Sequence, residues 1–285
     1  MIQSAIAGLV SGGAYAALGV CVVVMQRMVG VLNFAQAAIG AFGAFVVFVL
    51  YGDGIAYAPA ALAGTATAAG IAALLGLAMS TWFSEAGPRV RSTVAVAMLI
   101  TLLASGFRAF GDSPRTVPEV LPGVTFTVAG VVITAASVAA ITGSAAIALA
   151  LWLFLSRTRT GVRLRALSER PTSAELLGIP ARRLTVGVWA ATGAVSALAI
   201  LVIAPSRGGD FLSLSMLIVP ALAAALIGLF RSLGATVAGG IGIGLLEGLA
   251  TQSASIGPYR HALPLLVILA ILLWSQRSQV WDAAQ

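Results

Sequence analysis

The chain has 285 residues, of which 60% are hydrophobic and 9% are charged, and its mean hydropathy is +1.04. A soluble globular domain carries about 25% charged residues, so this composition excludes that class and indicates an integral membrane protein. The chain contains no lysine, which excludes a GxxxxGK[ST] phosphate loop, and one histidine with one cysteine cannot build a His/Cys metal cluster. We therefore expect no metal site, no cofactor and no catalytic centre in this chain.

Charged residues fall in clusters, and the uncharged runs between them predict membrane-spanning helices. A helix needs roughly 20 apolar residues to cross the hydrocarbon core. The runs are continuously apolar rather than alternating, which favours an α-helical bundle over an outer-membrane barrel. We predict an all-α polytopic bundle of about nine spans, between eight and ten, with the shortest runs, 92–107 and 261–276, as the candidates for broken or partial spans. In chain order the runs are 2–26, 28–52, 54–84, 92–107, 120–156, 184–206, 211–230, 232–259 (with Glu247) and 261–276.

The first run is expected to be a retained span, because no basic segment precedes it and no cleavage site follows it. Small residues recur every four positions in this run and in two others, a spacing that lets helix backbones approach closely in a membrane. These stripes are Gly8, Gly12 and Ala16; Gly40 and Ala44; and Gly240, Gly244 and Gly248.

Polar residues inside the second run mark a candidate functional region. The stretch GVLNFAQAAIGAFGAF places Asn33 and Gln36 three apart, on one face of a helix. In hydrocarbon these amides need partners, so they either join helices or line a pathway for a polar solute. Ser11 and Tyr15, four apart in the first run, form a possible facing surface, and we name all four as candidate pathway residues.

Glu247 is the acidic residue inside a predicted span. A carboxylate at this depth is costly unless it is paired or close to water. We expect either an ion pair with an arginine near the outer side, such as Arg108, or a position in a water-filled vestibule that a solute or an outside partner reaches.

The arginines predict the orientation of the chain. All sixteen basic residues are arginine, and seven lie in the loop at about 156–183, which the positive-inside rule places in the cytoplasm. With nine spans, twelve arginines fall on that side and four outside, so we expect the N-terminus outside and the C-terminus in the cytoplasm. Topology and anionic headgroups account for the net charge of +7, so membrane lipid is an expected partner and nucleic acid is not.

The same loop contains a short predicted helix. RPTSAELLGIPARR begins with Pro171 and a capping Thr172 or Ser173, and it stops at Gly178. Its apolar residues are displayed between charges, so they are expected to dock, either onto the membrane ends of this chain or into a partner.

Three stretches resemble motifs of the permeases of branched-chain amino acid ABC importers. The loop with its following run, TRTGVRLRALSERPTSAELLGIPARRLTVGVWAATGAVSALAILVI, is similar to the family's TxxGxxxRA stretch, LLGI helix and next span. GLVSGGAYAALGVCVVVMQRMVGVLNFAQAAIGAFGAF resembles its glycine-rich first span followed by GVxNFAxGxxxxxGAF. PALAAALIGLFRSLGATVAGGIGIGLLEGL resembles its AxxGGxGSLxGAxxGGxxLGLxE segment. Together these stretches are spread from residue 8 to residue 249 of the chain, and the NFAQ variant and short N-terminus indicate the H-type rather than the longer M-type permease.

The resemblance implies that residues 1–285 form a single transmembrane permease domain in a bacterial inner membrane, which imports a branched-chain or related amino acid. It implies as partners a second homologous permease, two cytoplasmic ATPase subunits and an extracytoplasmic solute-binding protein, so the chain itself is not an enzyme. The loop helix would be the coupling helix that seats in an ATPase cleft. Its coupling residues would be Ser173, Glu175, Leu176, Leu177, Gly178 and Ile179.

The sequence also departs from the family pattern. Ala37 and Ala38 stand where the family often has Gly and Glu, and bulky Leu229, Phe230 and Arg231 replace its usual GGIGS turn. These differences leave open a related importer for urea, short amides or sugars. A self-sufficient channel or secondary carrier is a further alternative, although it would be expected to show inverted internal repeats, and we find no convincing repeat between the halves.

Overall fold

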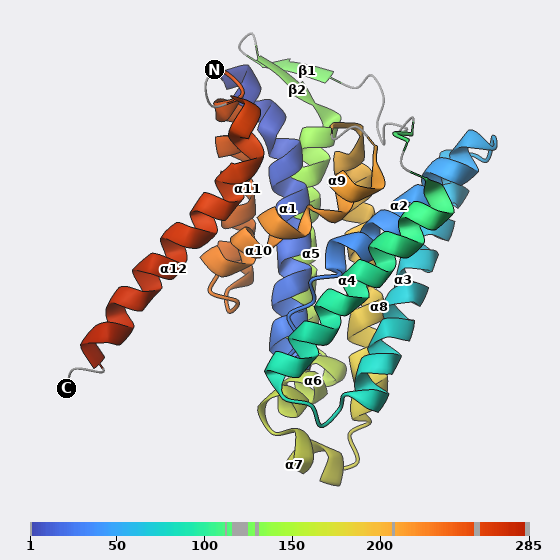
Figure 1. Cartoon of the computed structure of the whole chain (residues 1–285), viewed down its shortest axis with the longest axis vertical. Coiled ribbons are helices and arrows are strands. Elements are labelled where there is room, and N and C mark those ends of the chain that lie inside the picture. Colours follow the sequence, from blue (N-terminus) through green and yellow to red (C-terminus); the bar gives the residue numbers. More distant parts are fainter. Residues whose placement is uncertain are drawn as a thin grey trace.

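Helices make up most of the described chain, as the apolar runs predict (Figure 1). The computed structural model describes residues 2–111, 113–115, 125–128, 131–206, 209–253 and 257–282. The α-helices are α1 (Ile2–Val29), α2 (Gln36–Gly52), α3 (Tyr57–Trp82), α4 (Pro88–Phe110), α5 (Ala135–Arg157), α6 (Arg159–Glu169), α7 (Pro171–Leu176), α8 (Ala181–Ile203), α9 (Phe211–Ser215), α10 (Ile218–Ile227), α11 (Leu233–Ala250) and α12 (Leu263–Asp282). Two 3-10 helices, η1 (Ala204–Ser206) and η2 (Gly257–Ala262), precede α9 and α12.

The predicted spans correspond to helices in the described part of the chain. Seven helical segments there are long and apolar enough to cross a membrane, and two shorter apolar segments, 36–52 and 211–227, join them. Each segment lies mainly within one predicted run, so the prediction of an all-α polytopic bundle is confirmed.

The break in a span falls elsewhere than the shortest runs suggest. Both α4 and α12 are continuous helices, whereas the run 211–230 divides into α9 and α10 at Met216–Leu217. Pro220 explains this break, because a proline ring clashes with the carbonyl group four residues earlier, at Met216. Pro264 is harmless, because it lies in the first turn of α12, where its missing N–H has no helical partner.

A β-hairpin is the one departure from the helical prediction in the described chain. Strands β1 (Thr125–Val128) and β2 (Val131–Thr134) pair antiparallel, with Thr125 opposite Thr134. They take up the start of the run 120–156, so its helix, α5, begins only at Ala135. Thr134 caps that helix, because its Oγ1 accepts a hydrogen bond of 3.2 Å from the Ser137 N–H.

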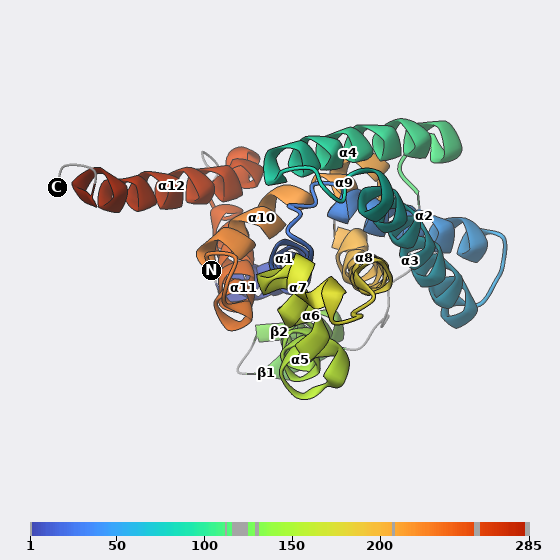
Figure 2. The same ribbon diagram turned by 90° about the horizontal axis from the view of Figure 1, so that it is seen from below.

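Helix α1 occupies the centre of the bundle. It packs against α5, α8, α10 and α11, and the view from below shows it surrounded by these helices (Figure 2). Helices α2 and α3 pack against α8 on one side, while α4 and α12 lie at the periphery. The first helix begins at the top of Figure 1, and α6 and α7 form the opposite end.

The small-residue stripes of α1 and α11 form one shared interface. A β-carbon added at Gly8 or at Gly12 would meet the backbone of α11, at Gly244 and at Ile241 respectively. A β-carbon added at Gly240 would likewise meet the Ala16 backbone. Two stripes that the sequence predicts separately therefore face each other, and they let the two helices touch backbone to backbone.

Candidate functional site

The segment from α5 to α8 builds the end of the molecule that carries the predicted loop helix. Helix α5 passes into α6 through a tight turn at Thr158, whose Oγ1 accepts from the Gly161 N–H at 3.0 Å. Gly161, Leu164 and Leu167 form the buried face of α6. Because α6 is fixed in this way, the short helix that follows it has a defined position.

Helix α7 begins at Pro171 and ends before Gly178, as the sequence predicts, but neither Thr172 nor Ser173 caps its start. Pro171 takes the first helical position, so the N-cap is Arg170, which makes no side-chain capping hydrogen bond, and the two hydroxyl residues lie inside the helix.

The C-terminal end of α7 has a specific cap. Gly178 adopts φ +79°, a left-handed conformation that glycine takes without strain. The Gly178 N–H donates to the Glu175 carbonyl at 2.9 Å, and the Ile179 N–H donates to the Ala174 carbonyl at 3.1 Å. This pair of bonds is a Schellman motif, which satisfies the last carbonyls of the helix.

The leucines of α7 point away from the chain that carries them. Ala174 is 3% exposed and faces inward, whereas Leu176 and Leu177 are 85% and 83% exposed. Of the other predicted coupling residues, Ser173, Glu175 and Gly178 are exposed and Ile179 is partly buried. The alternative that these leucines pack onto the membrane ends of their own chain is wrong for this structure.

Asn33 and Gln36 form a hydrogen-bonded cluster with a third residue, Ser196 on α8. The Asn33 Nδ2 donates to Gln36 Oε1 at 2.9 Å, and the Gln36 Nε2 donates to Ser196 Oγ at 2.7 Å. All three side chains are fully buried. Ser196 was not among the predicted residues, although a serine inside the apolar run 184–206 is a signal that the sequence shows. The cluster joins the start of α2 to α8. Of the two roles that the sequence suggests for these amides, joining helices or lining a pathway, this geometry fits the first.

Asn33 itself lies in a turn rather than inside a helix. Helix α1 ends at Val29 and α2 begins at Gln36, and Asn33 Oδ1 accepts from the Ala35 N–H at 3.0 Å in the connection. The prediction that the two amides share one face of a helix is therefore wrong for Asn33, and they contact each other because the Asn33 side chain stabilises the turn into α2.

Glu247 is paired with Tyr15, not with the predicted Arg108. The Tyr15 hydroxyl donates to Glu247 Oε2 at 2.7 Å, and the two residues are 0% and 5% exposed. Arg108 is exposed on α4, which packs against α2 and α9 rather than beside α11. The contact of α1 with α11 explains this pairing, because it brings the tyrosine within reach of the carboxylate.

The four candidate pathway residues separate into two places. Asn33 and Gln36 lie between α2 and α8, whereas Tyr15 lies between α1 and α11. Ser11, one turn before Tyr15 on α1, is partly buried. The structure thus connects Tyr15 with Glu247, and it does not bring the two predicted pairs into one cluster.

Comparison with known proteins finds one family model, one curated protein and one solved structure that are similar to this chain. Residues 4–272 match the family model described as branched-chain amino acid transport system, permease component. A probable branched-chain amino acid transport permease protein, LivH, of Methanocaldococcus jannaschii is 28% identical over 135 residues, which are 43% of this chain and 41% of that relative. The solved structure of PsaBC from Streptococcus pneumoniae in complex with Fab is 18% identical, with a TM-score of 0.48, over 96% of this chain and 90% of the other.

Proposed function

The chain belongs to the family of permease components of branched-chain amino acid transport systems, and we propose that it is the transmembrane subunit of an ATP-driven importer. With a second, homologous permease it provides an inward pathway for a branched-chain or related amino acid. Two cytoplasmic ATPase subunits drive the transport, and an extracytoplasmic solute-binding protein delivers the solute. The chain contains no lysine for a phosphate loop, so hydrolysis belongs to the ATPase partners.

The exposed leucines of α7 are the observation that carries this proposal. Burying a leucine side chain contributes about 1.5–3 kcal/mol, so two leucines exposed side by side at one end of the chain favour a docking partner. Helix α7 is capped at Gly178 and packs through the buried Ala174, so it can pass a movement of a docked partner on to the rest of the chain as a rigid unit. We assign α7 as the coupling helix that seats in an ATPase cleft and converts ATPase closure into alternating access.

The arginine distribution supports the proposed orientation. Arg27 near the end of α1 donates from Nη1 to the Arg231 carbonyl at 2.8 Å, which places that end of α1 beside the turn between α10 and α11. This end also carries α6 and α7 with their arginines (Figure 1). The positive-inside rule then puts this end in the cytoplasm and the start of α1 outside.

The test is a pull-down of the tagged chain from detergent-solubilised membranes. Wild type is expected to bring down an ATPase and a second permease, and Leu177→Asp is expected to lose the ATPase alone. Leu177→Met is the conservative control, and Leu229→Asp introduces the same charge at another leucine, 62% exposed, in a different loop. Both controls are expected to retain the ATPase.

Two results would count against the proposal. If wild type purifies alone and transports in liposomes without ATP, the chain is a channel or carrier. If Leu229→Asp loses the ATPase as completely as Leu177→Asp does, α7 is not the specific coupling element. Uptake of labelled leucine compared with urea in cells that contain the whole assembly tests the solute, and leucine is the expected one.

A further inference from the structure

A cleft at the α6–α7 end of the bundle is rich in arginine. It has a volume of about 400 Å³, and Arg27, Arg91 and Arg182 line it together with one carboxylate, Glu175. Within the described residues, none of these arginines forms an ion pair. The lining thus carries two more positive than negative charges, which favours an anionic ligand.

The hydrogen bonds of these arginines leave donors available. Arg27 donates from Nη1 to the Arg231 carbonyl at 2.8 Å. Arg91 donates from Nε to the Phe83 carbonyl at 3.1 Å and from Nη2 to the Ser84 carbonyl. Arg182 donates to no residue in the described part of the chain. Each guanidinium has five N–H groups, so all three retain donors for a phosphate.

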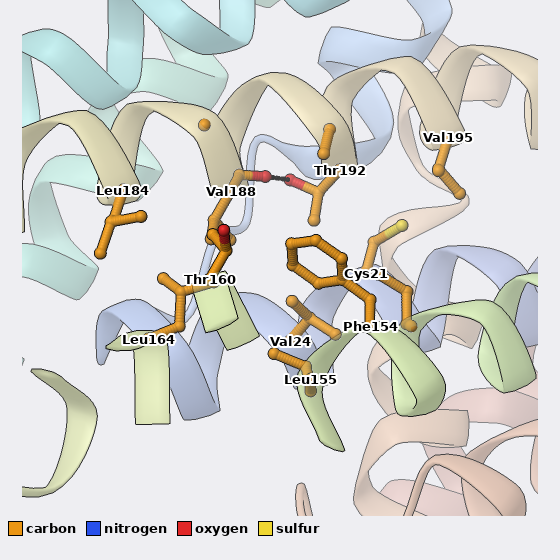
Figure 3. A pocket seen from close by; sticks show the side chains of 13 residues that line it. Cys21, Val24, Phe154, Leu155, Thr160, Leu164, Leu184, Val188, Thr192 and Val195 are labelled. Atoms are coloured by element: carbon orange, nitrogen blue, oxygen red, sulfur yellow. Dashed lines mark hydrogen bonds between the residues drawn. The ribbon is translucent and has the colours of Figure 1, made fainter. Parts of the chain in front are cut away.

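A second cavity, of about 130 Å³, lies between α1, α5, α6 and α8 and is apolar (Figure 3). Phe154, Leu155, Leu164 and Val188 are among its lining residues, and none of the lining residues is charged. The buried hydroxyl of Thr192, which also lines this cavity, already donates a hydrogen bond of 2.9 Å to the Val188 carbonyl. The volume is close to the roughly 150 Å³ of an apolar cavity that takes up benzene, so it suits a short length of hydrocarbon chain.

The two cavities follow each other along the same helices. On α6, Thr160 and Leu164 line the apolar cavity, and Leu167 and Ser168 line the basic cleft. Their spacing of three and four residues puts them on one face of the helix. Helix α1 repeats the pattern, with Cys21 and Val24 in the cavity and Met28 in the cleft.

We propose that these cavities form one binding site for an anionic phospholipid, with the headgroup phosphate against Arg27, Arg91 and Arg182 and a segment of acyl chain in the apolar cavity. One guanidinium group can donate two parallel hydrogen bonds to the oxygens of a phosphate. Basic pockets between membrane helices bind acidic lipid headgroups. Inorganic phosphate shares the headgroup chemistry, but it has no part that would occupy the apolar cavity. Phe154 is 40% exposed, so the lining of that cavity extends to the outer surface of α5.

Native mass spectrometry of the full chain, purified in a mild detergent, tests the site. The chain is incubated with phosphatidylglycerol, with phosphatidylcholine, or with inorganic phosphate, and the retained molecules are counted. Wild type is expected to retain one phosphatidylglycerol per chain and to prefer it to phosphatidylcholine. Arg182→Gln is expected to weaken this binding about tenfold or more, because it removes charge-assisted hydrogen bonds.

Matched variants separate the head and tail parts of the proposal. Arg183→Gln removes the adjacent arginine, which does not line the cleft, and it is expected to bind lipid as wild type does. Gly187→Phe fills the apolar cavity from a position where an added β-carbon meets open space, and it is expected to reduce lipid binding. Gly70→Phe, at a glycine of α3 that is equally open and lines neither cavity, is expected to have no effect.

Three outcomes would overturn the proposal. Equal retention of phosphatidylglycerol and phosphatidylcholine would remove the anionic selectivity. Equal losses in Arg182→Gln and Arg183→Gln would show a diffuse surface charge effect. If inorganic phosphate binds as tightly as the lipid and Gly187→Phe changes nothing, the cleft is a free-phosphate site and the apolar cavity plays no part.

Discussion

The α1–α11 contact and the α6–α7 end of the molecule differ in how their apolar and charged groups are buried and paired. In the first, glycines allow backbones to touch, and Glu247 is buried with a hydrogen bond from Tyr15. In the second, Leu176 and Leu177 are exposed and three arginines line a cleft that holds a single carboxylate. The centre of the bundle thus makes its contacts within the chain, whereas the α6–α7 end presents apolar and charged groups that other molecules can contact. Variants of the two regions should therefore fail in different ways.

The largest expected effect is in the α1–α11 contact. Gly244→Leu places a side chain against the Gly12 backbone and the Gly8 carbonyl, which cannot move aside as a flexible side chain can. We expect the free energy of unfolding in mild detergent to fall by about 3 kcal/mol or more. Gly242→Leu is the matched control on the same helix, because an added β-carbon there meets open space. Equal stability of the two variants would show that the close approach is not required.

The Tyr15–Glu247 hydrogen bond comes next. Tyr15→Phe removes a hydrogen-bond donor to a buried carboxylate, so the free energy of unfolding should fall by about 1–3 kcal/mol. Combining Tyr15→Phe with Glu247→Gln in a double-mutant cycle should give a coupling energy of about 0.5 kcal/mol or more. Additive effects of the two changes would mean that the bond contributes nothing to stability.

The amide cluster distinguishes a role in folding from one in the pathway. Asn33→Leu removes the donor to Gln36 and the acceptor for the Ala35 N–H, so the free energy of unfolding should fall by about 1–3 kcal/mol. Ser196→Ala should act in the same direction, and uptake should fall only in proportion to the amount of folded chain. Normal stability with reduced uptake per folded chain would instead identify these residues as part of the pathway wall.

Sequence reasoning located features that depend on neighbouring residues. The bounds of α7 follow from Pro171 and Gly178, and the spans follow from apolar runs interrupted by arginine. It was less successful where distant segments meet. Tyr15 and Glu247 are 232 positions apart, and Gln36 and Ser196 are 160 apart, so only the packing of the helices identifies these partners. The hairpin at the start of the run 120–156 was missed because apolar β-branched residues suit a strand as well as a membrane helix.

A smaller effect is expected in the turn between α10 and α11, where two residues with bulky side chains adopt positive φ. Leu229 and Phe230 adopt φ of 50° and 51°, a conformation that costs a residue with a β-carbon about 1–2 kcal/mol. Leu229→Gly relieves this strain, but it also raises the conformational entropy of the unfolded chain. We therefore expect the free energy of unfolding to rise by only about 0.5 kcal/mol. Leu229→Ala keeps a β-carbon and should give no such gain, which separates strain from the loss of an exposed side chain. If Leu229→Gly lowers stability, the leucine makes contacts within the chain that outweigh its backbone strain.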